Sequence, residues 1–315
     1  MSTRLARTAR RLALALLVAA PGARPVRAQP AVATSVARAA AAAPRLADAA
    51  SIGARFETVR VATGVRLRYA VAGDPGAPPV VLLHGLADSW YSFARVLPAL
   101  ARTHRVYALD QRGHGASERP TAGYTMTGMA DDVLAFLDAL DIPRAALVGH
   151  SMGSFVARHV ATRAPDRVSR LVLVGSGLRG ATAATRTLPA LFAPLPDAVP
   201  DAFAREWQGS TVYAPVPAEY MERWILECRQ VPARVWRSGL DGLLADAPAT
   251  VDRAPRMPTL LLSGDRDAVF TVADQDSLGR VWPAVHRLRY ADVGHAPHWE
   301  VPARFAQDVL AFLAR

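Results

Sequence analysis

A serine between glycines lies near the middle of the chain, in residues 149–153 (GHSMG). An apolar run, residues 145–148, precedes this motif, and an amphipathic stretch, residues 152–164, follows the serine. A G-x-S-x-G pattern between a strand and a helix places its serine on a sharp, strained turn with the hydroxyl facing outward. The first amides of the helix would favour an oxygen anion formed beside Ser151. The pattern therefore predicts that Ser151 is a nucleophile.

Two loops downstream of Ser151 offer the base and the acid that a serine nucleophile needs. Residues 264–267 (GDRD) follow the apolar run 259–262, and residues 294–298 (GHAPH) come shortly after the run 287–290. Because ligands bind beyond the carboxyl ends of parallel strands, we expect both loops at the sheet edge that holds the serine. The chain order serine, acid, histidine is the order expected of such a sheet.

The elements that must position these loops alternate along the chain. The apolar or β-branched runs are residues 65–71, 80–83, 105–109, 145–148, 171–174, 259–262 and 287–290, and the amphipathic stretches include 92–101, 126–140, 152–164 and 302–313. This alternation predicts a mostly parallel sheet with helices on both faces. Residues 177–257 break the alternation: helical patterns occur at 218–229 and 233–244, without a convincing strand. We therefore predict a helical insertion there.

Taken together, these motifs resemble the α/β-hydrolase superfamily over residues 56–315. Besides the serine motif, they comprise HG at residues 84–85, DQRGHGAS at 110–117, GDRD at 264–267 and GH at 294–295. The resemblance implies an α/β fold with a mostly parallel, eight-stranded sheet and helices on both faces. It also implies a hydrolase core made of residues 56–176 and 258–315, with residues 177–257 as a helical cap inserted after the sixth strand.

The resemblance also assigns the catalytic roles, with Ser151 as nucleophile, Asp267 as acid and His295 as base. Asp265 remains a rival for the acid, although a first-position aspartate in such a loop usually binds loop amides. His298 remains a rival for the base, although His295 is the histidine that directly follows a glycine. A triad of these three types can transfer a proton during acyl transfer.

Acyl transfer passes through an oxyanion that backbone amides have to stabilise. The amide of Met152 is one donor by its position after the serine, and the resemblance points to the amide of Leu86 for the second. Aromatic side chains are expected in the pocket wall, which favours an apolar small-molecule substrate. The predicted substrate-binding residues are Trp90, Trp207, Tyr213 and Trp224. The resemblance implies no metal ion and no cofactor.

The predicted reaction is hydrolysis of a carboxylic ester or lactone through an acyl-enzyme. Carbon–carbon bond hydrolases and cofactor-free haloperoxidases or perhydrolases of the superfamily also use a serine, so the motif leaves these alternatives open. Epoxide hydrolases and haloalkane dehalogenases carry an aspartate in place of Ser151, and dienelactone-type enzymes a cysteine, so all three are disfavoured. A non-catalytic ligand sensor on a hydrolase scaffold is the alternative from another class.

Composition and charge exclude a disordered chain and disfavour a nucleic-acid partner. The chain has 315 residues, of which 51% are hydrophobic and 20% charged, enough for a folded core. Its net charge is +10, but residues 1–55 contain nine arginines and one acid, so residues 56–315 carry only +2. The one cysteine, Cys228, can form no internal disulfide, and we expect a buried thiol.

The first residues have the pattern of an export signal, predicted over residues 1–28. Arginines precede an apolar run at residues 12–20, and VRA at residues 26–28 offers small residues for cleavage near Ala28. We therefore expect a periplasmic or secreted protein with a disordered or weakly helical tether over residues 29–55. The apolar run is shorter than the roughly 20 residues that a membrane-spanning helix needs, so no stable span is expected.

Overall fold

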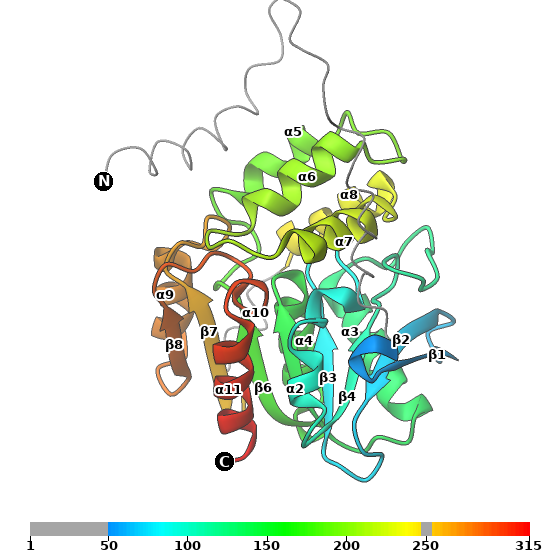
Figure 1. The fold of residues 1–315 in the computed structure, drawn as a ribbon, viewed down its shortest axis with the longest axis vertical. Helices are drawn as coiled ribbons and strands as arrows, with labels where there is room; N and C mark the ends of the chain where they lie inside the picture. The colour runs from blue at the N-terminus through cyan, green and yellow to red at the C-terminus, as the bar shows by residue number, and fades with distance from the viewer. Residues whose placement is uncertain (1–49, 247–253) are drawn as a thin grey trace, which may run out of the picture. The chain divides into compact units, whose positions relative to one another are not determined.

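An eight-stranded sheet forms the centre of the molecule (Figure 1). The computed structural model describes residues 50–246 and 254–315, so the predicted signal peptide and the predicted tether up to residue 49 lie outside the described residues. The strands are β1 (Arg55–Arg60), β2 (Arg66–Ala72), β3 (Pro79–Leu83), β4 (Arg105–Leu109), β5 (Ala145–His150), β6 (Val168–Val174), β7 (Thr259–Gly264) and β8 (His286–Tyr290). The sheet thus begins at Arg55, the last residue of the predicted tether.

The strand order in the sheet is β1-β2-β4-β3-β5-β6-β7-β8. Strand β2 pairs antiparallel with both β1 and β4, and every other neighbouring pair is parallel. This arrangement confirms the predicted mostly parallel, eight-stranded sheet. The parallel strands β3, β5, β6, β7 and β8 end at one edge of the sheet, and the loops that follow them meet there.

The central strands are apolar on both faces because helices cover both sides of the sheet. Successive side chains of a strand point to opposite faces. Val81 and Leu83 of β3 therefore belong to the core on one side, and Val80 and Leu82 to the core on the other. Helices α3 (Met126–Ala139), α4 (Met152–Arg163) and α9 (Val272–Val281) cover the first face, and α2 (Leu97–Leu100) and α11 (Pro302–Leu313) cover the second.

Two elements differ from the sequence prediction. Strand β1 is absent from the predicted runs because it is an edge strand whose residues are mostly exposed, so it carries no apolar pattern. The amphipathic stretch predicted over residues 92–101 divides into the 3-10 helix η3 (Trp90–Phe93) and the single turn α2. The other 3-10 helices of the described residues are η2 (Ala50–Ile52), η4 (Pro165–Arg167) and η5 (Thr185–Thr187).

Within the described residues between β6 and β7, four α-helices cover the carboxyl ends of the strands (Figure 1). They are α5 (Leu188–Phe192), α6 (Asp201–Ser210), α7 (Ala218–Arg229) and α8 (Ala233–Leu244), and we call them the cap helices. Helices α7 and α8 have the bounds predicted for them. Rings of Phe192, Phe203, Trp207 and Trp236 pack edge-on among these helices, with centroids 5.3–6.1 Å apart. Cys228 is a buried free thiol within α7.

A buried arginine on α4 binds both ends of the segment of residues 177–246, which contains the cap helices and which we call the cap segment. The Arg158 guanidinium donates to the carbonyls of Gly177 and Leu178, at 2.9 and 3.2 Å, where the chain enters the cap. It also donates to Asp246 Oδ2, at 3.2 Å, just after the last cap helix. Burial lowers the pKa of Arg158 to about 10, and the Asp246 carboxylate opposes that shift. Since Ser151 is the residue just before α4, the cap is tied to the helix that directly follows the predicted nucleophile.

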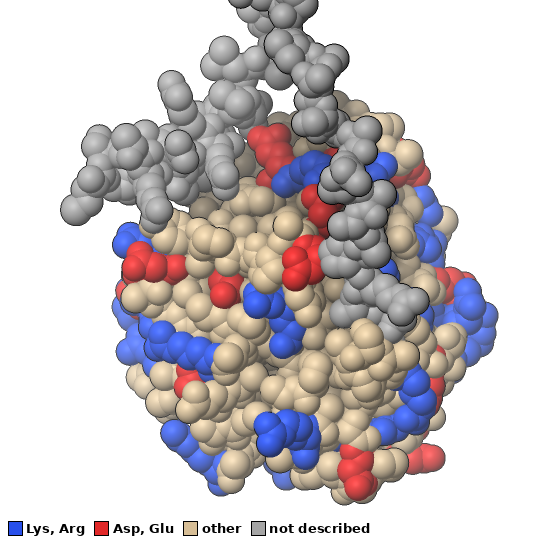
Figure 2. All heavy atoms as spheres, viewed as in Figure 1, with Lys and Arg blue, Asp and Glu red and all other residues tan. Residues whose placement is uncertain are grey.

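Charged side chains are spread over the surface. On the face shown in Figure 2, arginines and acidic residues lie among one another without a continuous basic stripe. Within residues 50–246 and 254–315, no helix is both long and apolar enough to cross a bilayer. In the same part of the chain, no three or more His, Cys, Asp or Glu side chains are grouped so as to hold a metal ion.

Candidate active site

Ser151 occupies a strained turn between β5 and α4. Its φ of 51° and ψ of −122° lie in a region that L-residues rarely adopt. The turn is held by a 2.9 Å hydrogen bond from the Ser151 amide to the Val174 carbonyl. A Cβ at Gly153 would lie 2.2 Å from the carbonyl oxygen of Leu83, and one at Gly149 would lie 2.3 Å from that of Gly153. The two glycines therefore let helix and strand approach closely enough to form this turn.

His295 and Asp267 form a hydrogen-bonded pair on the loops after β8 and β7. Nδ1 of His295 lies 2.9 Å from Oδ2 of Asp267, and both side chains are buried. The other carboxylate oxygen of Asp267 accepts from the amides of Val269 and Phe270, at 2.8 and 2.9 Å. The His295 amide donates to the Thr211 carbonyl of the cap segment at 2.9 Å. The acid and the imidazole are thus both fixed in orientation.

The two rivals lie in other surroundings. Oδ1 of Asp265 accepts from the Asp292 amide at 2.8 Å, so this carboxylate holds the loop and makes no hydrogen bond to His295. Nε2 of His298 lies 3.1 Å from Ser92 Oγ, and burial lowers the pKa of His298 to about 3. Neither rival lines the pocket that contains Ser151.

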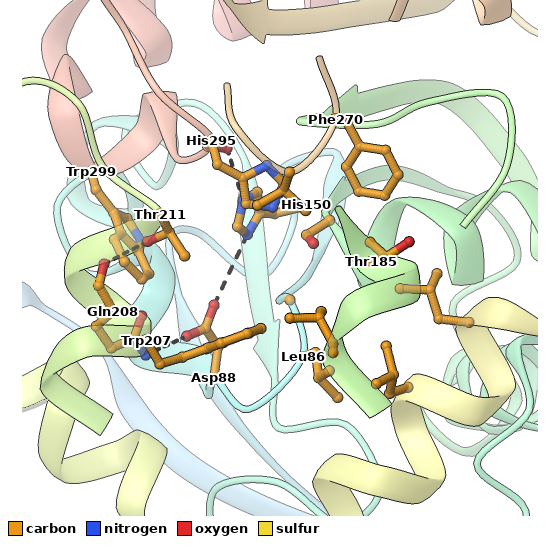
Figure 3. Close-up of a pocket in the computed structure, with 16 residues that line it drawn as sticks. Leu86, Asp88, His150, Thr185, Trp207, Gln208, Thr211, Phe270, His295 and Trp299 are labelled. Atoms are coloured by element: carbon orange, nitrogen blue, oxygen red, sulfur yellow. Dashed lines mark hydrogen bonds and ion pairs between the residues drawn. The ribbon is translucent and has the colours of Figure 1, made fainter. Parts of the chain in front are cut away.

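Ser151 and His295 both line one pocket of about 510 Å³, open mouth included. Figure 3 shows the walls of this pocket, with His295 among them. Asp267 does not line this pocket and lies behind His295. The walls are mostly apolar, with contributions from the sheet edge and from the cap helices. They include Leu86, Leu188, Trp207, Leu240, Leu243, Val269, Phe270 and Trp299. An apolar group of a small molecule fits this lining.

The predicted oxyanion donors lie beside the serine. A Cβ at Gly85 would be 3.2 Å from Ser151 Cβ, so the loop after β3 touches the nucleophile's turn. The side chain of the next residue, Leu86, lines the pocket. Met152 is the first residue of α4. Within the described part of the chain, neither the Leu86 nor the Met152 amide donates a hydrogen bond, so both are free to bind an oxygen anion.

Of the four predicted substrate-binding residues, only Trp207 lines this pocket. Trp90 is fully buried and packs edge-on against the phenylalanine of β1. Trp224 stacks on Trp299 with ring centroids 4.0 Å apart, which makes it part of the packing between α7 and the core. Tyr213 is 39% exposed at the surface. The predictions for Trp90, Trp224 and Tyr213 are therefore corrected: their rings serve packing or face solvent.

The sequence prediction missed a carboxylate in the pocket wall. Asp88 is buried beside His150, and its carboxylate points toward that imidazole (Figure 3). Gln208 of α6 also lines the pocket and donates to Asp88 Oδ1 at 3.1 Å. The available signal was the position of Asp88 three residues after Gly85, in the loop that carries the predicted oxyanion donor.

Comparison with known proteins identifies the fold and the family. The sequence profile of the alpha/beta hydrolase fold matches residues 78–216. The chain is 31% identical over 275 residues to 2-hydroxymuconate semialdehyde hydrolase of Pseudomonas sp. (strain CF600), covering 81% of this chain and 92% of that protein. A hydrolase from Pseudomonas aeruginosa PA01 superposes with a TM-score of 0.74 and 26% identity, over 83% of this chain and 99% of that one. The enol-lactonase from Burkholderia xenovorans LB400 shares the fold, with a TM-score of 0.66 and 24% identity, over 82% and 100%.

Proposed function

The chain belongs to the α/β-hydrolase superfamily, and we propose that it is a serine hydrolase that cleaves carboxylic esters or lactones through an acyl-enzyme. The observation that carries this proposal is the placement of His295, which lines one pocket with Ser151 and bonds Asp267 through Nδ1. A hydroxyl, an imidazole and a carboxylate in this order can move a proton from nucleophile to leaving group. The apolar pocket walls support a substrate with an apolar acyl or alcohol part.

In the first half of the reaction, Oγ of Ser151 attacks the substrate carbonyl while Nε2 of His295 takes its proton. Asp267 holds the proton of the imidazole on Nδ1, which leaves Nε2 free to accept. The amides of Leu86 and Met152 stabilise the oxyanion, an effect worth about 3 kcal/mol of barrier per donor. The tetrahedral intermediate collapses when His295 protonates the leaving alcohol, and Ser151 is left esterified.

In the second half, water takes the place of the alcohol. Nε2 of His295 removes a proton from the water as its oxygen attacks the acyl carbon. The second tetrahedral intermediate breaks into a carboxylic acid and the serine alkoxide, which recovers its proton from His295. Each turnover therefore consumes one ester and one water and restores the enzyme.

Hydrolysis of a carbon–carbon bond is the second candidate, favoured by the similarity to 2-hydroxymuconate semialdehyde hydrolase across most of both chains. The same serine and histidine would serve that reaction. Comparing kcat/KM for p-nitrophenyl butyrate, a lactone and a ring-cleavage semialdehyde separates the two. A semialdehyde turned over far faster than the esters would favour the second candidate.

The central test replaces the nucleophile. We expect Ser151→Ala to abolish multiple turnover of p-nitrophenyl butyrate with little change in Tm, because the variant keeps the fold and loses only the attacking oxygen. Ser277→Ala, on the exposed face of α9, is the matched control and should retain full activity. Equal activity of wild type and Ser151→Ala would refute the proposed function. A single stoichiometric burst from the wild type would instead favour a ligand sensor.

A further inference from the structure

Asp88 stands in the wall of the pocket next to the nucleophile. The position that a Cβ of Gly85 would take lies 3.2 Å from Ser151 Cβ and 3.3 Å from Asp88 Oδ2, so serine and carboxylate flank the same loop backbone. Asp88 is only 6% exposed, and the surface that it retains faces the pocket. An acyl group bound for attack by Ser151 therefore lies close to this carboxylate.

In the described part of the chain, the Asp88 carboxylate has no arginine partner. Oδ1 accepts from the neutral amide of Gln208, and Oδ2 from Ser92 Oγ at 3.4 Å. Among residues 50–246 and 254–315, no arginine lines the pocket. A buried carboxylate without a counter-ion is an unusual arrangement, because burial of an unpaired charge is costly.

The titratable groups around Asp88 are three histidines and a thiol. His150 Nδ1 lies 4.0 Å from Asp88 Oδ2, and burial keeps the pKa of His150 well below its usual value, so this imidazole is neutral at pH 7. His295 shares the pocket, His298 lies beyond Ser92, and the buried thiol of Cys228 is close enough to be influenced by the Asp88 charge. Burial raises the pKa of Asp88 to about 6.

We propose that Asp88 is a specificity-determining residue that excludes acyl groups carrying a negative charge, so that the enzyme acts on uncharged esters and lactones. This inference rests on the proposed function and names its substrate class. An anionic acyl group would lose its water in an apolar pocket, meet the Asp88 carboxylate and find no cation to compensate it. An uncharged acyl group pays neither cost. The same feature disfavours muconate-type substrates, which carry a carboxylate.

The test compares two esters of equal acyl length, p-nitrophenyl butyrate and mono-p-nitrophenyl succinate, whose acyl chain ends in a carboxylate. At pH 8 the wild type should prefer the butyrate by about a hundredfold in kcat/KM, and Asp88→Asn should reduce that preference about tenfold, because like charges placed close together cost up to several kcal/mol. Asp131→Asn is the matched control: it removes one carboxylate from the exposed face of α3 and should leave the preference unchanged.

A pH series on the wild type tests the same inference without a variant. The preference for butyrate should shrink as pH falls from 8 to 5.5, because Asp88 becomes protonated over this range. The free carboxyl of the succinate ester has a pKa of about 4.3 and stays ionised. Equal rates on the two esters at pH 8, or a preference unaffected by both Asp88→Asn and pH, would overturn the inference while the proposed function stands. Failure to hydrolyse either ester would refute the proposed function itself.

Discussion

Asp267 is held by more groups than any other acid of the candidate site. Its two oxygens accept from the His295 ring and from the amides of Val269 and Phe270. An asparagine in its place must turn its NH₂ group either toward the Nδ1–H of His295 or toward the two amides, and both choices set donor against donor. The carboxylate is therefore required to keep the imidazole in the productive tautomer.

Asp267→Asn should consequently lower kcat for p-nitrophenyl butyrate by about 10³- to 10⁴-fold. Asp265→Asn is the matched control, since this acid binds the Asp292 amide on the same loop and an asparagine oxygen can replace it there. We expect its kcat to stay within about twofold of the wild type, as for a surface polar change. Steady-state kinetics at pH 8 measures both. A comparable loss in the two variants would show that loop integrity matters, and not the acid at position 267.

The residue types and their spacing were sufficient to predict that Ser151 and the loops 264–267 and 294–298 lie at one end of the sheet, because each follows a parallel strand. The choice of Asp267 over Asp265 and of His295 over His298 came from the family resemblance. The same reasoning was insufficient for the pocket wall. Trp224 and Tyr213 belong to the cap segment. The position of this segment on the core depends on packing between elements far apart in the chain, and such packing leaves no local pattern in the sequence. This is also why the sequence gives no sign of the contact between Asp88 and Gln208.

At the scale of elements, every described strand except β1 was predicted, although β6 begins three residues before its predicted run. Strand β4 and helices α7, α8 and α11 have the predicted bounds, because each carries a strong apolar period. The mostly exposed residues of β1 carry no such period. The connections between cap and core likewise depend on single polar groups, of which Glu300 is the most heavily used.

Glu300, at the end of α10 (Pro297–Glu300), ties the cap segment to the loop that carries the base. Its carboxylate accepts from the amides of Gly294, Tyr213 and Ala214, at 2.9, 3.0 and 2.6 Å. Gly294 directly precedes His295. The carboxylate thus acts as a positioning group, which holds the imidazole loop against the cap without touching the substrate.

Replacing this carboxylate should loosen the base. Glu300→Gln places an NH₂ group among backbone donors, so we expect unfolding free energy to fall by about 1–3 kcal/mol. If Glu300 positions His295, kcat for p-nitrophenyl butyrate should fall about tenfold with KM nearly unchanged, because the loss is in the transition state. Glu222→Gln, which removes an exposed ion pair with Arg205 on the cap, should change both quantities little. A stability loss with unchanged kcat would contradict the positioning role.

At the scale of the whole molecule, the pH dependence of stability follows from buried titratable groups. Among the described residues, four buried histidines have a lowered pKa, and Asp88 is a buried acid whose pKa is raised to about 6. Burial lowers the pKa of His84 to about 4 and those of His114 and His298 to about 3, and it holds that of His150 well below its usual value. Below about pH 6.5 these histidines therefore bind protons in the unfolded chain and stay neutral in the folded chain. Asp88 acts in the opposite sense, since its raised pKa lets the folded chain bind a proton first below about pH 6.

The effect of the four histidines is larger than the opposite effect of Asp88. The free energy of unfolding should therefore fall as pH decreases from 6.5 to 5.5, by about 3 kcal/mol per pH unit. Urea unfolding at a series of pH values measures the slope. His114→Asn removes one of these buried imidazoles and should flatten the slope by about 1 kcal/mol per pH unit over this range, whatever its effect at pH 7. Ser277→Ala on α9 removes no titratable group and should leave the slope as it is. A wild-type stability that is constant over this range would mean that the buried imidazoles accept protons in the folded state.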